Sequence, residues 1–119
     1  MIDSSVMNSY ERARERGVLK DTRHVLIIDD QSTGRAILEK IILQIADNIE
    51  VIPFSEPRAA MDWLDENSVD LIVTDYMMPA MNGIDVIKEV RTKAHCKNVP
   101  IMMITVSSER EIRYEALES

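Results

Sequence analysis

The chain has 119 residues, of which 45% are hydrophobic and 29% charged, and its formal net charge is −7. This length suits one domain with a single core, and the composition is that of a globular protein. The acidic balance argues against non-specific nucleic-acid binding by this segment, because such binding needs a basic face. We therefore expect no direct contact with nucleic acid.

A single cysteine, Cys96, excludes an internal disulfide and gives no sign of a zinc cluster, which is typical of a reducing compartment. No stretch approaches the ~20 apolar residues of a membrane span, and the N-terminus lacks the apolar core of a signal peptide. We expect a cytoplasmic protein without a membrane partner.

Residues 1–23 differ from the rest of the chain. They are rich in charge, poor in apolar residues and interrupted by Gly17, which predicts a solvated N-terminal arm or a short helix. A docking helix is the alternative, and nothing in the pattern favours it. A regular pattern begins at His24, so we place the folded domain at residues 24–119.

The first part of that domain predicts two strands joined by a helix. "HVLIIDD" (24–30) is a short apolar run that ends in two acids. "IEVIPF" (49–54) is a second strand, which Pro53 limits to an edge position or to its end. The intervening segment, 32–48, is predicted to be an amphipathic helix with an apolar face made of Leu38, Ile41, Ile42 and Ile45.

The same alternation continues along the chain. Ser55 as N-cap and Pro57 in the first turn begin the next helix, whose apolar face holds Ala60, Trp63 and Leu64. "DLIVTDY" (70–76) is the third strand and "VPIMMITV" (99–106) the fourth. Between them lies a helix with an inner face made of Gly83, Val86, Ile87 and Val90.

Three of the strands are apolar without polar alternation. With helices between them, this predicts an α/β fold, a doubly wound parallel sheet buried on both faces by crossover helices. The last segment, "SSEREIRYEALES" (107–119), is predicted to be a further helix opened by Ser107 or Ser108. Sheets of this kind bind ligands at the carboxyl ends of their strands.

Acidic residues stand at those carboxyl ends. Asp29 and Asp30 terminate the first strand, and Asp75 terminates the third. In a right-handed βαβ arrangement these strands can be neighbours, which would gather three carboxylates on one rim. Because like charges repel at that range, the cluster favours a divalent cation such as Mg²⁺. Thr105, at the end of the fourth strand, would add a hydroxyl.

A carboxylate beside Mg²⁺ can attack phosphorus and form an acyl phosphate, and Thr105 could donate to a phosphoryl oxygen on Asp75. Each signal alone has a plainer interpretation. A strand-end aspartate often caps a helix or forms a turn, and a lone threonine in a strand is often only a β-branched residue. The conjunction of two acidic strand ends with a hydroxyl strand end favours a phosphoryl-transfer site.

The runs "VLIIDDQ", "DLIVTDYMMPAMNG" and "PIMMITV" resemble the receiver domain of two-component response regulators. Thr105 follows Asp75 at the distance that the family pattern expects. The family's D-x-x-M-P-x-x-x-G spacing is matched by Asp75, Met78, Pro79 and Gly83. The resemblance implies a flavodoxin-like sheet with strand order 2-1-3-4 in a bacterial signalling protein.

The resemblance also implies a role for each residue. Asp75 would be the phosphoacceptor, receiving phosphate from the phosphohistidine of a sensor histidine kinase. Asp29 and Asp30 would hold Mg²⁺ with Asp75, and the backbone carbonyl of Met77 would be a further ligand. Thr105 would be the switch hydroxyl. The protein would be a phosphorylation-controlled switch that relays to an output domain, with no enzymatic activity beyond its own phosphorylation and dephosphorylation.

Two features depart from the family pattern. The family's phosphate-neutralising lysine, aromatic switch residue, fifth strand and last helix would all lie beyond Ser119, so the resemblance implies a chain truncated before the fifth strand. Val106 stands where the family usually has a small residue, which could narrow access to Asp75. Without a fifth strand, we expect the strand at 99–106 to expose an apolar edge, and we hypothesise a homodimer through that edge.

Two alternative functions use similar residues. A magnesium phosphatase or phosphotransferase with an aspartyl phosphate needs a second acid two residues after the nucleophile, where this chain has Met77. A receiver-like protein-interaction module would work without phosphorylation. The lack of the lysine keeps that alternative open for this chain, whereas the complete set of acids and the hydroxyl argue against it for the parent protein.

Overall fold

The computed structural model describes residues 22–106 and 112–117, with residues 105, 106 and 112–117 described by their backbone alone. In chain order its elements are β1 (Arg23–Ile28), α2 (Ser32–Leu43), β2 (Ile49–Phe54), α3 (Pro57–Asp65), β3 (Leu71–Asp75), α4 (Gly83–Thr92), η1 (Ala94–Cys96), β4 (Ile101–Val106) and β5 (Ile112–Leu117). Within the described ranges, no helix combines the length and the apolar character needed to cross a membrane.

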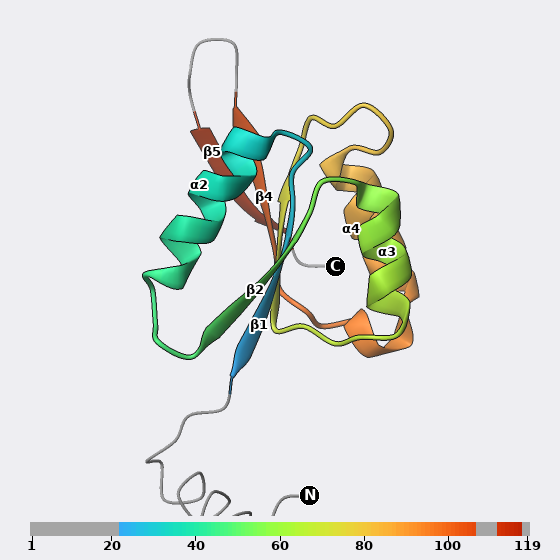
Figure 1. Ribbon diagram of the computed structural model, residues 1–119. Helices are drawn as coiled ribbons and strands as arrows, with labels where there is room; N and C mark the ends of the chain where they lie inside the picture. Colours follow the sequence, from blue (N-terminus) through green and yellow to red (C-terminus); the bar gives the residue numbers. More distant parts are fainter. Residues whose placement is uncertain (1–21, 107–111, 118–119) are drawn as a thin grey trace, which may run out of the picture.

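A sheet in the order β2-β1-β3-β4-β5 forms the centre of the molecule (Figure 1). The first four strands of that order run parallel to one another. This confirms the predicted fold class and the order 2-1-3-4. β2 lies at an edge of the sheet, which agrees with Pro53, since proline lacks the N–H that a central strand would use.

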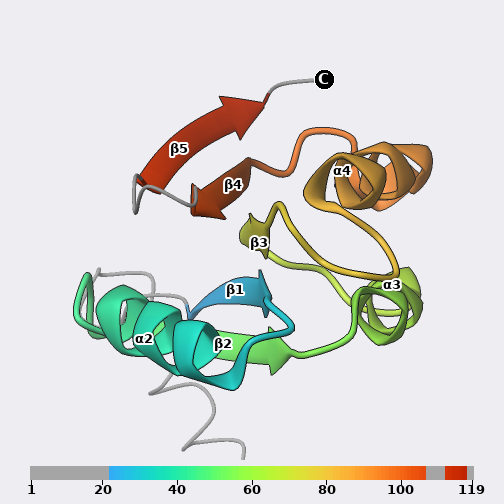
Figure 2. The ribbon, with the colours of Figure 1, turned by 90° about the horizontal axis from the view of Figure 1, so that it is seen from above.

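Helices cover the sheet from both sides, with α3 and α4 on one face and α2 on the other (Figure 2). Successive strand residues point to opposite faces, so β1, β3 and β4 each contribute to both cores, and this is why these three strands are largely apolar. The core beneath α3 and α4 includes Leu26, Ile28, Ala60, Leu64, Ile72, Val86 and Val90. The core beneath α2 is made of Val25, Ile27, Ile42, Val73 and Ile104.

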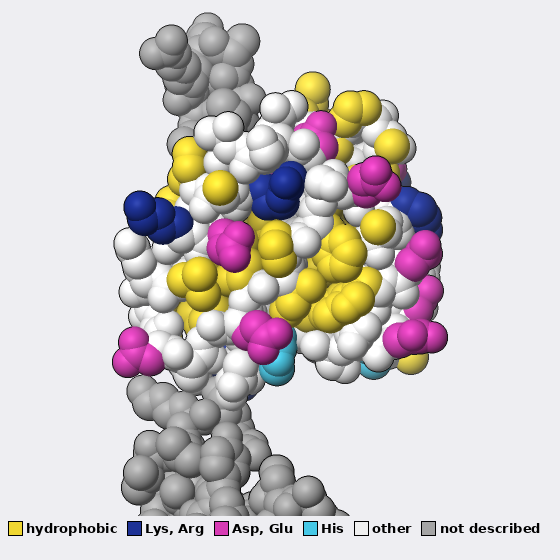
Figure 3. Space-filling view, viewed as in Figure 1, with side chains coloured by type: hydrophobic (Ala, Val, Ile, Leu, Met, Phe, Trp, Pro, Cys, Tyr) yellow, Lys and Arg dark blue, Asp and Glu magenta, His cyan; other side chains and the backbone are white. Residues whose placement is uncertain are grey.

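The apolar face predicted for α2 is only partly correct. Ile42 is buried and Leu38 packs at the border of the core, but Ile41 is 53% exposed and Ile45 is 71% exposed. The helix lies mainly against β2 and β1, so only a narrow stripe of its surface is buried against the sheet. α2 also ends at Leu43, earlier than predicted. Figure 3 shows hydrophobic side chains gathered in the middle of the view, between α2 and α3, with acidic groups scattered around them.

The remaining helices begin close to where the sequence predicts. α3 has Pro57 at its first position, but its N-cap is Glu56 instead of Ser55. α4 starts with a capping box, in which the Asn82 side chain accepts from the Asp85 amide at 2.9 Å and the Asp85 carboxylate accepts from the Asn82 amide at 3.2 Å. This reciprocal pair satisfies donors that would otherwise be unpaired at the helix start.

The helix predicted for residues 107–119 is wrong over residues 112–117. This segment forms β5, antiparallel to β4, with Ile112 opposite Val106 and Leu117 opposite Ile101. The unpaired backbone edge of β4 supplies hydrogen-bonding partners that outweigh a weak helical pattern, and Ile112 and Tyr114 suit a strand. The proposed N-caps, Ser107 and Ser108, lie outside the described residues.

β5 also overturns the premise of the dimer hypothesis. It pairs with β4 along the full length of that strand, from Ile101 to Val106. The edge of β4 is therefore not exposed, and a homodimer through that edge has no structural basis.

Candidate functional site

The three predicted carboxylates meet at one edge of the sheet. Ile28 pairs with Thr74, so the next residue of each chain segment, Asp29 and Asp75, lies just beyond the last pair of β1 and β3. Asp29, Asp30 and Asp75 each offer a carboxylate oxygen, and these oxygens lie within 4.8 Å of one another. The edge is at the top of Figure 1, where β1 turns toward α2. The predicted convergence is therefore present.

Asp29 is the most buried member of the cluster and is held on several sides. Its Oδ1 accepts a hydrogen bond from the Gln31 amide at 2.9 Å, and Nη1 of Arg35 donates to its backbone carbonyl at 2.9 Å. Burial raises the pKa of the Asp29 carboxyl, and the charge of Asp30 raises it further, against the opposing effects of Gln31 and Arg35. The surrounding residues therefore do not fully compensate for the burial of the ionised Asp29 carboxylate.

The carboxyl of Asp75 is affected in the same way as that of Asp29, and Asp30 has a buried oxygen beside them. Burial raises the pKa of the Asp75 carboxyl, and the charge of Asp29 adds to the rise, while the amides of Met77 and Tyr76 lower it. Oδ1 of Asp30 is buried without a hydrogen-bond partner among the described residues. A buried unpaired oxygen is costly, and a set of carboxylate oxygens is what Mg²⁺, Mn²⁺ and Ca²⁺ bind in proteins. The residues therefore fit a hard divalent cation.

The two other predicted site residues are placed by their backbone. Met77 lies two residues beyond Asp75, with a side chain that is 67% exposed. Thr105 follows Ile104, which pairs with Asp75, and the Tyr76 amide donates to the Ile104 carbonyl at 2.9 Å. Thr105 is thus at the same edge as the acids. Its hydroxyl lies outside what the structure describes, so its role as the switch stays a prediction.

The loop after Asp75 needs a glycine at its far end. The Gly83 amide donates to the Tyr76 carbonyl at 2.9 Å and closes the loop. A Cβ on Gly83 would stand 2.9 Å from the backbone oxygen of Asp75 and 2.8 Å from Sδ of Met103. The start of α4 therefore lies against the backbone of Asp75, and this close approach explains why glycine suits position 83.

Sequence reasoning missed two residues beside Asp29. Gly34 and Arg35 both lie in α2, and the Arg35 guanidinium is the cation whose charge acts on Asp29. A glycine early in a helix of good helix formers, a few residues after an acid pair, was the available signal.

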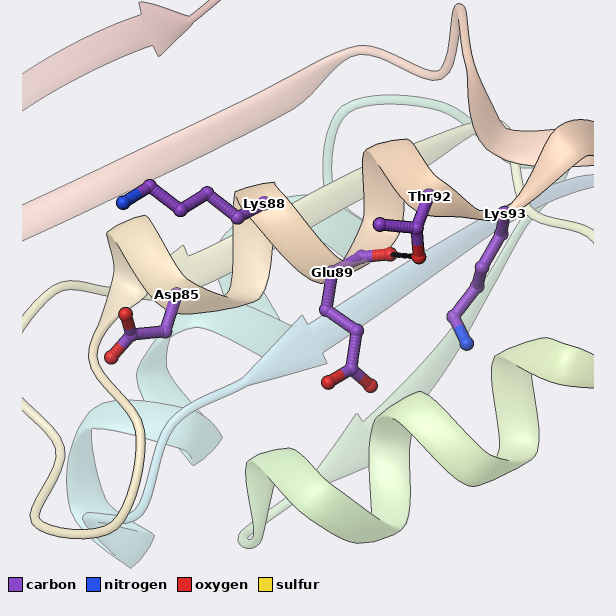
Figure 4. Close-up of a pocket in the computed structure, with 5 residues that line it drawn as sticks. All are labelled: Asp85, Lys88, Glu89, Thr92 and Lys93. Atoms are coloured by element: carbon purple, nitrogen blue, oxygen red, sulfur yellow. Dashed lines mark hydrogen bonds between the residues drawn. The ribbon is translucent and has the colours of Figure 1, made fainter.

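A polar depression of about 580 Å³ has none of the three aspartates in its lining. Figure 4 shows its lining on the outer side of α4, made of Asp85, Lys88, Glu89, Thr92 and Lys93. Two of its charged groups are engaged with α3, since Nη2 of Arg58 lies 2.6 Å from Oε1 of Glu89 and Lys93 pairs with Asp65. Its lining mixes acids and bases and does not gather carboxylate oxygens as the acidic edge does, so the carboxylate cluster is the stronger candidate for the functional site.

A parallel sheet with three acids at its carboxyl edge is also found in known families of signalling domains, as comparison with known proteins shows. The family model described as the response regulator receiver domain matches residues 25–119. The chain belongs to the response regulator receiver domain family.

Curated relatives include both short and long proteins. The chain is 34% identical over 96 residues to the cyclic di-GMP phosphodiesterase response regulator RpfG of Xanthomonas campestris pv. campestris, covering 81% of this chain but 25% of RpfG. It is 32% identical over 102 residues to the chemotaxis protein CheY-3 of Vibrio cholerae, covering 86% of this chain and 78% of CheY-3. The chain thus spans about a quarter of the length of the first relative and most of the second.

Solved structures agree on the fold. The chemotaxis response regulator CheY4 of Vibrio cholerae superposes with a TM-score of 0.66 at 28% identity, covering 73% of this chain and 71% of that chain. The receiver domain of the sensor histidine kinase PA1611 from Pseudomonas aeruginosa has a TM-score of 0.66 at 18% identity, covering 73% of this chain and 70% of that chain. The second likeness concerns the fold alone.

Proposed function

We propose that this chain is the phosphoacceptor switch of a two-component system. In this proposal Asp75 accepts a phosphoryl group from the phosphohistidine of a sensor histidine kinase, and the change is relayed to an output domain. The observation that carries the proposal is the convergence of Asp29, Asp30 and Asp75 within 4.8 Å at the carboxyl edge of the sheet. We place this exchange in the cytoplasm, as the single cysteine favours.

The transfer needs a positioned carboxylate more than acid–base chemistry. A carboxylate oxygen of Asp75 forms a bond to phosphorus while the phosphorus–nitrogen bond of the phosphohistidine breaks, and the electron pair stays on the imidazole nitrogen. The product is an acyl phosphate on Asp75. The backbone amide of Met77, which lowers the pKa of the Asp75 carboxyl and so favours its ionised form, would help to orient it for this step.

Asp29 and Asp30 would hold Mg²⁺ together with Asp75 and the Met77 carbonyl. When bound, Mg²⁺ supplies charge neutralisation for the carboxylates and the phosphoryl oxygens. The unpaired Oδ1 of Asp30 supports this assignment, because it needs a partner that the described residues do not offer. The structure of the PA1611 receiver domain has a magnesium ion in its active-site cleft, but at 18% identity that likeness supports the fold and not the metal.

The signal would leave the site through the fourth strand. A phosphoryl group adds roughly −1.5 to −2 charges at pH 7, and the Thr105 hydroxyl would donate to it from the end of β4. The order of the strands supports this route, since β4 is the neighbour of β3 and Ile104 pairs with Asp75. The length of RpfG beyond the matched region supports an output domain as the reader of that change.

Phosphorylation with a small phosphodonor tests the proposal. The chain is incubated with Mg²⁺ and acetyl phosphate, and intact mass spectrometry should show the addition of one phosphoryl group. Asp75→Asn should abolish the adduct because the nucleophilic oxygen is lost. Asp62→Asn, which changes an exposed carboxylate on α3, is the matched control and should keep it.

Two results would contradict the proposal. An adduct that persists in Asp75→Asn would move the nucleophile elsewhere. A wild-type chain that binds Mg²⁺ but forms no adduct with acetyl phosphate or with a phosphorylated kinase would favour the interaction module that works without phosphorylation.

A further inference from the structure

We infer that Gly34 is a positioning residue of the proposed cation site, where its missing side chain keeps the space that Oδ2 of Asp29 occupies. This inference rests on the proposed function, because it concerns how the chain prepares Asp29 to bind Mg²⁺. Neither the sequence motifs nor the comparisons assign a role to this position.

The space around Gly34 is unusually tight on the side of the acid cluster. A Cβ on residue 34 would stand 2.6 Å from Oδ2 of Asp29 and 3.5 Å from its Cγ. Gly34 does not adopt the left-handed backbone conformation that favours glycine. Alanine is otherwise the better residue within a helix. The reason for glycine at this position is therefore the neighbouring carboxylate and not the backbone.

Asp29 cannot yield to a methyl group at residue 34 without consequence. Its Oδ1 is fixed by the Gln31 amide, and its backbone carbonyl is fixed by Arg35. A displaced Oδ2 must either disturb the Gln31 hydrogen bond or change its separation from the other carboxylates. Both displacements disturb the oxygen arrangement that a small cation such as Mg²⁺ demands.

The two described glycines that approach the site differ in what they touch. The atom nearest to a Cβ on Gly34 belongs to the end of a side chain, whereas a Cβ on Gly83 would meet a backbone oxygen of Asp75. A side chain can move while the fold stays intact. Alanine at position 34 should therefore weaken cation binding without weakening the metal-free fold.

The test measures these two properties separately in the whole chain. Magnesium affinity is measured by isothermal titration calorimetry, and stability is measured by urea unfolding in EDTA. For Gly34→Ala we expect a dissociation constant for Mg²⁺ that rises by about tenfold or more, as is typical for groups that orient a metal ligand. We expect the metal-free midpoint in urea to stay the same or to rise.

Two controls isolate the mechanism. Ala36→Gly lowers helix propensity at an exposed position of the same helix, so it should lower the urea midpoint and leave the magnesium affinity unchanged. In an Asp29→Ala background, Gly34→Ala should cause no further loss of affinity, since its effect acts through the Asp29 carboxylate. A merely structural effect of Gly34→Ala would persist in that background.

The outcomes separate the inference from the proposed function. If the wild-type chain does not bind Mg²⁺, the metal-dependent part of the proposed function fails. If the wild-type chain binds Mg²⁺ and Gly34→Ala binds it equally well, or loses affinity equally with and without Asp29, the inference alone is overturned. Unfolding of metal-free Gly34→Ala would also overturn it, because the cost would then fall on the fold.

Discussion

The two ends of the sheet differ in how their charged side chains are arranged. At the amino end, Oδ2 of Asp70 accepts from the His24 amide at 2.8 Å, and Oδ1 of Asp70 lies 3.7 Å from Nη1 of Arg23. His24 also lies 3.7 Å from Glu50, measured from Nε2 to Oε2. At the carboxyl end, three aspartates meet with one guanidinium nearby, and one carboxylate oxygen has no partner among the described residues.

This difference separates charged groups that stabilise the fold from charged groups that destabilise it. The amino end places acids beside basic residues at exposed positions, where an ion pair such as Arg23–Asp70 adds a small stabilisation. The carboxyl end gathers like charges in partly buried positions, which lowers the stability of the metal-free chain. A local loss of stability of this kind is typical of functional sites, and it is what the proposed cation and phosphoryl group would offset.

The largest expected effect is the response to magnesium. Mg²⁺ at about 100 times its dissociation constant should raise the free energy of unfolding by about 2.7 kcal/mol, because it binds the folded chain only. Urea unfolding with and without Mg²⁺ measures this. Sodium chloride at equal ionic strength is the control. Equal stabilisation by both salts would show that Mg²⁺ does not act specifically at the carboxyl end of the sheet, and the contrast between the two ends would fail.

A second effect comes from the titration of the carboxyl end in EDTA. The pKa values of Asp29 and Asp75 are raised above their ordinary 3.8, so the folded chain keeps these protons at a pH where the unfolded chain has lost them. The contribution of these two carboxyls to the free energy of unfolding should therefore be largest below pH 3.8. It should fall as the pH rises from 3.8 through the raised pKa values.

Asp75→Asn should remove the contribution of residue 75 to that fall. At pH 7 in EDTA this variant should be more stable than the wild type by about 0.5 to 2 kcal/mol, as is common when a functional group that costs stability is replaced. The measurement is urea unfolding of both chains across the pH range. If the free energy of unfolding fell with pH at the same slope in the wild type and in Asp75→Asn, the repulsion between carboxylates at the carboxyl end of the sheet would be negligible.

The smallest effect is expected at the amino end. Asp70→Ala removes the acceptor of the His24 amide and the partner of Arg23, so it should lower the free energy of unfolding by about 0.5 to 1 kcal/mol at pH 7. Its magnesium affinity should equal that of the wild type. If Asp70→Ala raised the free energy of unfolding, the charges at the amino end would not stabilise the fold, and the contrast with the carboxyl end would fail.

Much of the site could be predicted because it depends on strand ends. An apolar run followed by an acid places that acid at the carboxyl end of a buried strand, and neighbouring parallel strands bring such acids together. Asp29, Asp30 and Asp75 follow this rule. Gly34 and Arg35 could not be assigned in this way, because their roles depend on distances between α2 and Asp29 that no periodic pattern encodes.

The same distinction explains the errors in the fold. Ile41 and Ile45 match a helical face in the sequence, but α2 lies mainly against β1 and β2 and leaves both side chains exposed. Residues 112–117 match a weak helix, but the edge of β4 pairs with them. In both cases the local pattern was compatible with the prediction, and a neighbouring segment decided the outcome.

The sequence alone determined the alternation of strands and helices, the parallel core of the sheet and the edge on which the acids lie, because hydrophobic periodicity and short connections act locally along the chain. Only the tertiary structure decided which helical side chains are buried, how β5 pairs and how close Gly34 comes to Asp29. Those features depend on the space and hydrogen-bonding groups that one segment presents to another, and neither is a property of a single stretch of sequence.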